Sequence, residues 1–213
     1  MATQTSGMTS FNTLARAGEF TDGGNTFKWV NRTNAQTSNN VYANLLFSNS
    51  GEAQQTFPVS LSNATVNYFV ITGLSSTVPS GATINGITVK FERFGDQGIN
   101  EFLTVADSAI YLTKDGTNTV GNNKSTGAAW ATSDNNTTTD FGGASDLWGT
   151  TLTAAEVNAS TFGVMISPSL TSSSTEGGTN VKIDQVTITV DYTETVASRR
   201  RAVFSTKAEL RIV

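Results

Sequence analysis

Apolar and polar residues alternate along several segments of this chain, and this pattern restricts the fold more than any other feature of the sequence. The clearest alternation places three apolar side chains on one side of an extended segment, Ile87, Val89 and Phe91. Residues 103–113 repeat the pattern. An alternation of period two is typical of a β-strand with one buried face and one wet face. The sequence therefore predicts a protein built mainly of β-strands.

Further segments of strand length are separated by clusters of Asn, Ser and Gly. They include residues 41–47, 66–71 and 162–166, and turn residues are plentiful, with 19 Gly in the chain. One segment predicts a helix: Thr153 and Glu156 have the spacing of a capping box, in which each side chain bonds the backbone N–H of the other residue. Apart from this single turn, we expect almost no helix.

The last strand-like segment contains a change of register. Val181 and Ile183 alternate with polar residues, and from Val186 onward the apolar positions have shifted by one. A shift of one residue predicts a β-bulge at Asp184-Gln185. Strands of this length and spacing favour an antiparallel two-sheet jelly-roll sandwich with extended N- and C-terminal arms.

The segments between strands carry two further predictions. Val78-Pro79-Ser80-Gly81 predicts a tight turn, because Pro fixes φ and Gly accepts a positive φ. Residues 116–146 are rich in Gly, Asn and Thr. We interpret them as a long loop with one short strand and with Trp130 near its centre.

Three regions follow from these patterns. Residues 1–19 are small and polar without periodicity, which predicts an N-terminal arm. Residues 20–195 contain the strand signals and predict the sandwich. Residues 196–213 form a C-terminal tail that is both basic and apolar. A chain of 213 residues with these signals is expected to form one domain between the two arms.

The absence of two residue types excludes much chemistry. The chain has no Cys and no His, so zinc or haem sites based on these residues, cysteine nucleophiles and Ser-His relays are all excluded. No reactive constellation stands out among the remaining residues. We therefore expect a protein that is not an enzyme and needs no cofactor. The first 20 residues lack the pattern of a secretory signal, which predicts synthesis in a cytoplasm without Sec export.

Charge is distributed unevenly along the chain. Residues 1–195 carry 8 basic and 16 acidic side chains, whereas residues 196–213 carry five basic side chains and one acidic one. An acidic body disfavours binding to nucleic acid, and no apolar run reaches the length of a membrane span. We expect neither nucleic acid nor a membrane as a partner.

The tail combines charge with apolar side chains and is the predicted partner-binding segment. The residues expected to bind a neighbouring subunit are Arg199, Arg200, Arg201, Val203, Phe204, Leu210 and Ile212. The arginines would pair with carboxylates, and the apolar residues would add as a strand or fill a groove. A terminal strand that completes the chain's own sandwich is the alternative.

Two other kinds of site were considered. Trp130, alone in the long polar loop, could stack on a sugar ring, whereas Trp29 and Trp148 have the surroundings of core residues. Three carboxylates in the same loop, Asp134, Asp140 and Asp146, could bind Ca²⁺, but their spacing does not match an EF-hand. We interpret them as solvated loop residues and predict no metal site.

Several segments resemble one jelly-roll module. The residues that carry the resemblance are Pro79–Ile87 running into Val89–Arg93, Phe141–Gly143, Asp146–Gly149, Phe162–Val164 and Ile183–Tyr192. The module recurs in structural proteins of tailed bacteriophages, and the resemblance covers about residues 27–194. It implies a fold and transfers no catalytic residue.

Together these observations predict a non-enzymatic virion structural protein of a tailed phage, made in the host cytoplasm. Its expected role is that of a capsid cement or decoration protein that bridges neighbouring subunits. The expected partners are other virion proteins, such as the major capsid protein or a neck or tail component, and further copies of the chain in a homo-oligomer. The alternative is a carbohydrate-binding or adhesin module of a tail fibre or cell-surface protein.

Overall fold

The computed structural model describes residues 1–48, 60–75, 77–95, 103–133, 138–173 and 181–195, and the structural statements below concern these residues. They form an all-β fold, which confirms the main expectation from the sequence. The strands are β1 (Ala2–Leu14), β2 (Thr21–Asp22), β3 (Asn25–Val30), β4 (Ala43–Ser48), β5 (Leu61–Thr65), β6 (Tyr68–Leu74), β7 (Thr83–Gly95), β8 (Leu103–Thr113), β9 (Thr119–Val120), β10 (Thr138–Gly143), β11 (Gly163–Ser172) and β12 (Val181–Thr193). The two short helices are the 3₁₀-helix η1 (Arg32–Ala35) and the α-helix α1 (Ala154–Val157).

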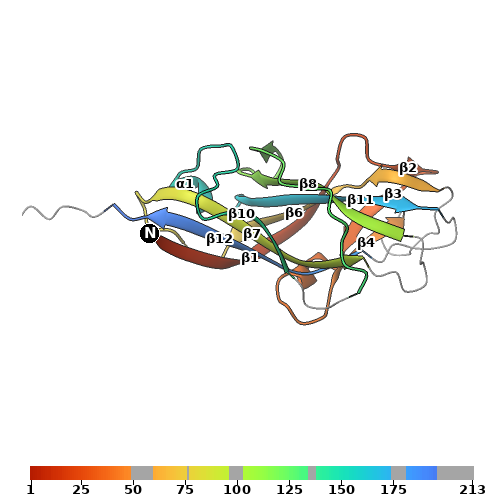
Figure 1. The fold of residues 1–213 in the computed structure, drawn as a ribbon, viewed down its shortest axis with the longest axis horizontal. Coiled ribbons are helices and arrows are strands. Elements are labelled where there is room, and N and C mark those ends of the chain that lie inside the picture. Colours follow the sequence, from red (N-terminus) through yellow and green to blue (C-terminus); the bar gives the residue numbers. More distant parts are fainter. Residues whose placement is uncertain (49–59, 76, 96–102, 134–137, 174–180, 196–213) are drawn as a thin grey trace, which may run out of the picture.

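The strands pair with one another antiparallel throughout the described ranges. The longest path of neighbours is β2-β3-β4-β12-β1-β6-β11-β8-β9, to which β7 and β10 are joined through β12, and β5 through β11. The strands follow the long axis of the molecule, with α1 and the N-terminus at one end and β2 and β3 at the other (Figure 1). None of the described helices is long and apolar enough to cross a membrane.

The N-terminal segment is a strand of the sheet and not the separate arm that the sequence predicted. Residues 2–7 of β1 pair with β12, and residues 8–14 pair with β6, so one strand connects two parts of the sheet. Only Ser6 and Met8 of β1 are buried. A strand that buries two side chains in thirteen positions shows no apolar alternation, which is why the sequence pattern missed it.

The bulge predicted in β12 is present. The register against β7 shifts between Ile183 and Gln185, and the extra residue, Asp184, is buried. Its Oδ2 atom accepts hydrogen bonds from the backbone N–H groups of Asn39 and Asn40, both at 3.0 Å. The bulge therefore turns a carboxylate toward the loop before β4 and fixes that loop to the sheet.

One apolar core spans the described residues, and it includes all three tryptophans, of which the sequence predicted two, Trp29 and Trp148. Trp29 stacks on Phe69 with ring centroids 4.9 Å apart. Trp148 is fully buried and donates from its indole nitrogen to the carbonyl of Ile87 at 2.9 Å. Both side chains thus pack in the core and keep their polar edges satisfied.

The long segment after β8 contains two short strands, β9 and β10, where the sequence predicted one. Strand β10 pairs with the outer edge of β7. Residues 128–131 run between β7 and β8: the N–H of Gly95 donates to the carbonyl of Ala131 at 2.8 Å, and the N–H of Trp130 donates to the carbonyl of Val105 at 2.8 Å. This loop therefore closes strand edges that would otherwise expose unpaired backbone groups.

Candidate assembly site at the end of β12

The last described residues of the chain are fixed to the start of β7. The hydroxyl of Thr195 donates to the carbonyl of Gly81 at 3.2 Å, and the side-chain amide of Asn85 donates to the hydroxyl of Thr193 at 2.9 Å. These contacts lie at the end of the molecule that carries α1 and the N-terminus (Figure 1). Thr195, the last described residue, is therefore held beside the turn that precedes β7.

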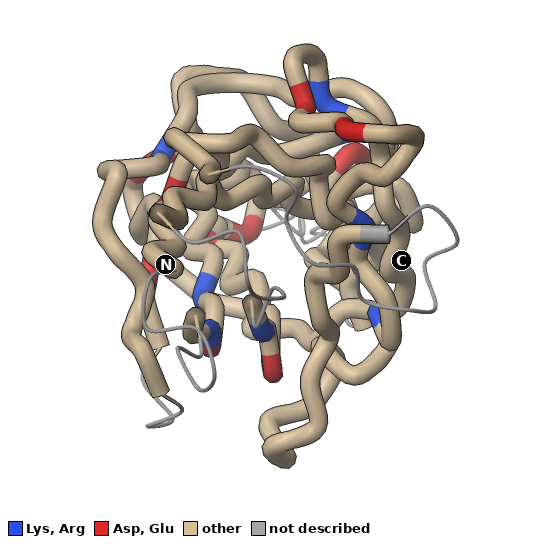
Figure 2. The backbone as a smooth tube through the Cα atoms, turned by 90° about the vertical axis from the view of Figure 1, so that its right-hand side faces the viewer, with Lys and Arg blue, Asp and Glu red and all other residues tan. Residues whose placement is uncertain are grey.

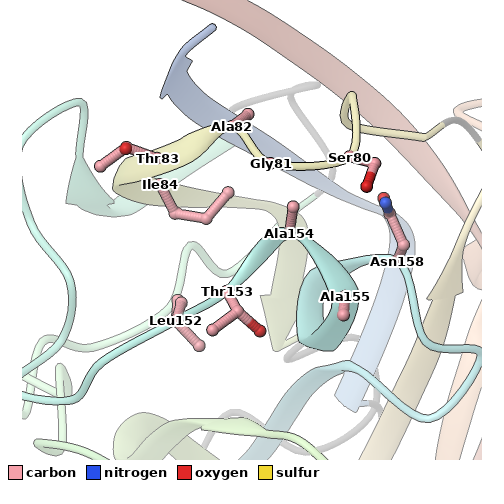
Figure 3. Close-up of a pocket in the computed structure, with 10 residues that line it drawn as sticks. All are labelled: Ser80, Gly81, Ala82, Thr83, Ile84, Leu152, Thr153, Ala154, Ala155 and Asn158. Atoms are coloured by element: carbon pink, nitrogen blue, oxygen red, sulfur yellow. The ribbon is translucent and has the colours of Figure 1, made fainter. Parts of the chain in front are cut away.

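A groove of about 500 Å³ opens next to this point. One wall is the segment that leads into β7, and the other is the segment that forms α1 (Figure 3). The lining residues are Ser80, Gly81, Ala82, Thr83, Ile84, Leu152, Thr153, Ala154, Ala155 and Asn158. Four of them are buried apolar residues, namely Ala82, Ile84, Leu152 and Ala154. The groove thus has an apolar floor with hydroxyl and amide groups along its rim.

The first wall is a tight turn one residue later than the sequence predicted. The N–H of Ala82 donates to the carbonyl of Pro79 at 3.1 Å, so Ser80 and Gly81 are the central residues. Gly81 has a φ of 82°, which a side chain would disfavour at this position. A Cβ atom on Gly81 would also lie 3.3 Å from the hydroxyl oxygen of Thr195. Glycine therefore allows both the turn and the close approach of Thr195.

The second wall is the capped helix α1, and it confirms the predicted capping box. The N–H of Glu156 donates to the Thr153 hydroxyl at 3.2 Å, and the N–H of Thr153 donates to the Glu156 carboxylate at 2.8 Å. The ammonium group of Lys114 lies 2.8 Å from the same carboxylate. This bond is the main reason why the pKa of Glu156 lies below its ordinary value. A helix of one turn is marginal by itself, and these bonds hold it in place.

The two walls are bonded to each other. The side-chain amide of Asn158 donates to the carbonyl of Val78 at 2.8 Å, and its oxygen accepts from the N–H of Val78, also at 2.8 Å. Thr83 and Thr153 form an isolated antiparallel bridge. The groove is therefore preformed, which reduces the conformational entropy that a bound partner would cost.

The groove offers contacts suited to binding. None of its lining residues is charged, and its polar groups are the hydroxyls of Ser80, Thr83 and Thr153 and the amide of Asn158, which is already bonded. The hydroxyl of Thr153 donates to the carboxylate of Glu156 at 2.9 Å, within the cap of α1. The surface suits an apolar side chain flanked by hydrogen-bonding backbone.

Trp130 does not lie at an exposed binding surface. It is 6% exposed, and its indole nitrogen donates to Asp107 at 2.8 Å. The guanidinium carbon of Arg93 lies 5.0 Å from the centre of its ring. A covered ring cannot stack on a sugar, so the glycan-binding role considered for Trp130 has to be corrected to a role in packing.

Trp130 instead covers a buried ion pair that the sequence analysis missed. Arg93 and Asp107 are 7% and 3% exposed, and the Nη2 atom of Arg93 lies 2.8 and 2.7 Å from the two carboxylate oxygens. Burial lowers the pKa of Arg93, and the neighbouring carboxylate opposes this shift. A signal was available, because Arg93 continues the alternation of Ile87, Val89 and Phe91 into the core.

Two of the three loop carboxylates considered for Ca²⁺ have lysine partners. Asp146 lies 2.6 Å from the ammonium of Lys124, a bond that is the main cause of its lowered pKa. Asp140 lies 3.6 Å from the ammonium of Lys90. Asp134 is outside the described residues. Within the described ranges, no group of three or more acidic side chains is arranged to hold a metal ion.

Basic and acidic residues are both present in the described part of the chain. Figure 2 shows basic and acidic residues interspersed along the backbone, with most positions uncharged. The predicted partner-binding residues of the tail, Arg199 to Arg201, Val203, Phe204, Leu210 and Ile212, lie outside the described residues. Thr195 is the last described residue before them.

The chain was compared with models of protein families, with curated proteins and with solved structures, and none of them matches it.

Proposed function

We propose that the chain is a non-enzymatic structural protein of a tailed-phage virion, and that it acts as a capsid cement or decoration protein. The observation that carries this proposal is that Thr195, the last described residue, is bonded beside a preformed, uncharged groove. The tail that follows holds five of the chain's 13 basic residues and ends in apolar ones. This combination suits a segment that attaches one subunit to the next.

The proposed architecture is a jelly-roll sandwich of two layers. One layer would contain β12 with β4, β7 and β10, and the other would contain β6, β11 and β8, with β1 contributing to both. Apolar residues from both sets of strands belong to one core cluster, which supports this arrangement. The resemblance of residues 27–194 to the jelly-roll module of phage structural proteins points the same way.

Several features favour an assembly role over the alternative of a carbohydrate-binding module. The tryptophan that suggested sugar binding is covered by Arg93 and bonded to Asp107. The groove at the end of β12 has no exposed aromatic ring among its lining residues. A surface of small and aliphatic residues fits a protein segment better than the face of a sugar.

Immunogold electron microscopy of purified virions, with antibodies raised against the full chain, tests the proposal. Regular labelling of particles is expected, together with a constant copy number per particle by quantitative mass spectrometry. Virions that lack the protein, although infected cells contain it, would contradict the proposed role. If the particles are labelled, a pull-down with the tagged chain from virions identifies which virion protein the chain contacts.

A further inference from the structure

The groove between β7 and α1 matches the chemistry of the tail. Its floor is apolar, and its volume of about 500 Å³ lies within the range of about 300–1,000 Å³ that is typical of sites that enclose a ligand. Residues 203–213 bring Val203, Phe204, Leu210 and Ile212. These are side chains that gain most from leaving water, and both edges of β12 are already paired in the described body.

The position of the tail favours the same groove. Thr195 is the last described residue, and its hydroxyl donates to the carbonyl of Gly81 on the rim. The 18 residues that follow could span roughly 60 Å at about 3.3 Å per residue. The part before Val203 contains Arg199, Arg200 and Arg201, and adjacent like charges favour extended linkers. This composition favours the groove of a neighbouring copy over the groove next to Thr195 as the binding place of residues 203–213.

Charge at the rim is complementary to the linker. Glu194 is exposed at the end of β12, whereas Glu156 on the second wall is already paired with Lys114. The carboxylate of Glu194 would lie near a tail that approaches the groove from another molecule. Exposed charges of opposite sign guide an approach and contribute little to the final affinity, so the apolar residues would hold the tail in place.

We propose that the groove between β7 and α1 receives residues 203–213 of a neighbouring copy of the same chain. This inference rests on the proposed bridging function and names its docking site. Two copies that exchange tails fill two grooves at once, which closes a symmetric pair, whereas one-way donation produces a chain or ring of subunits.

The lack of cysteine allows a direct test, because introduced thiols are the only ones present. One tagged full-length chain carries Ala155→Cys in the groove, and a second chain with a different tag carries Phe204→Cys. Under mild oxidation the mixed disulfide dimer is expected to form at least about tenfold faster than with the control Ala17→Cys, because docking holds the two thiols at a high effective concentration. Ala17 is exposed and does not line the groove.

Two outcomes would overturn the proposal. Equal rates for Ala155→Cys and Ala17→Cys would show that the tail does not dock in the groove. A chain carrying both Ala155→Cys and Phe204→Cys that closes an internal disulfide at high dilution, with no dimer in the mixed experiment, would show that the tail occupies its own groove.

A further variant separates the docking site from the proposed function. Ala155→Arg fills the groove with a bulky charge at an exposed helical position, where Arg is a good helix former. We expect it to abolish disulfide formation between Ala82→Cys and Phe204→Cys chains and to lower binding to virions. If the parent chain binds virions but the Ala82→Cys and Phe204→Cys chains form no disulfide even without Ala155→Arg, the docking site alone is contradicted. Disulfide formation by a protein that is absent from virions would contradict the virion function alone.

Discussion

Arg93 and Asp107 form an ion pair inside the core, where one guanidinium nitrogen lies within 2.8 Å of both carboxylate oxygens. Arg93 comes from β7 and Asp107 from β8, two strands that do not pair with each other. The indole of Trp130 donates to the same carboxylate from a third segment. The contact thus joins β7 and β8 through their side chains, beside the segment 128–131 whose backbone bonds both strands.

We expect the loss of either partner of this pair to destabilise the fold strongly. Asp107→Leu leaves the buried Arg93 guanidinium without its carboxylate, and breaking a buried pair in this way costs about 3–5 kcal/mol. The double variant Arg93→Met with Asp107→Leu should recover much of this loss, because it leaves no unpaired charge. Urea unfolding of the two single variants and the double variant gives the coupling energy. Additive losses would contradict a strong coupling between the two residues.

The dependence of stability on pH follows from the carboxylates with lowered pKa values. Asp146 and Glu156 bind fewer protons in the folded state at a given pH than in the unfolded state. Their contribution is complete above the unfolded pKa of about 4 and is lost as the pH falls through the lower folded values. Without histidine, we expect the melting temperature to be nearly constant from about pH 5 to 8 and to fall in acid.

A variant checks the origin of this acid sensitivity. Lys114→Met removes the bond that contributes most to the lowered pKa of Glu156. Its melting temperature should therefore be lower than that of the parent protein above pH 5. The two melting temperatures should approach each other in acid, where the carboxylate of Glu156 is protonated in both proteins. A steep change of stability near pH 6.5 in the parent protein would contradict this account.

Removal of metal ions should leave the stability unchanged. Asp140 and Asp146 already face Lys90 and Lys124, so a divalent cation would have to displace an existing ion pair. Differential scanning calorimetry with EDTA and with added CaCl₂ is expected to give one melting temperature. A decrease of several degrees in EDTA that calcium reverses would reveal a site that these lysine contacts do not suggest.

The parts of the fold that the sequence predicted are those in which side-chain burial alternates. Strand β7 buries Ile87, Val89 and Phe91, and the bulge in β12 was visible because Val186 continues the apolar series one position late. The capping box at Thr153 was predictable because it depends on two side chains three residues apart. In each case the signal is local and lies within a few residues.

The parts that the sequence did not predict depend on contacts between distant residues. Strand β1 is polar because it buries few side chains, and its order comes from pairing with β12 and β6. Trp130 lies in a polar loop, yet its ring is buried, because its indole nitrogen bonds Asp107 and its face packs against Arg93. The groove consists of residues 80–84 and 152–158, which pattern analysis treats separately. Tertiary pairing of this kind leaves no period in the sequence.

Deletion of residues 196–213 should leave a soluble, β-rich body that melts cooperatively. Strand β12 already has β7 on one side, and β4 and β1 on the other. The paired registers therefore occupy both edges of β12, so the body does not need the tail as a partner for β12. Circular dichroism and thermal unfolding of the 1–195 chain measure this. Failure of that chain to fold would show that the tail belongs to the body.

The same deletion should abolish association between subunits, while removal of charge alone should weaken it in a manner that depends on salt. The triple variant Arg199→Ala, Arg200→Ala, Arg201→Ala keeps Val203, Phe204, Leu210 and Ile212, so the apolar contacts remain. Screening at 1 M salt reduces the reach of charges to about 3 Å, and the variant and the parent protein should then associate equally. At low salt the parent protein should associate faster, because charge acts mainly on the rate of encounter. Light scattering and stopped-flow mixing at several salt concentrations distinguish the contribution of charge from that of apolar contacts. If the triple variant associates more weakly than the parent protein by the same factor at every salt concentration, the arginines act through direct contacts and not through long-range attraction.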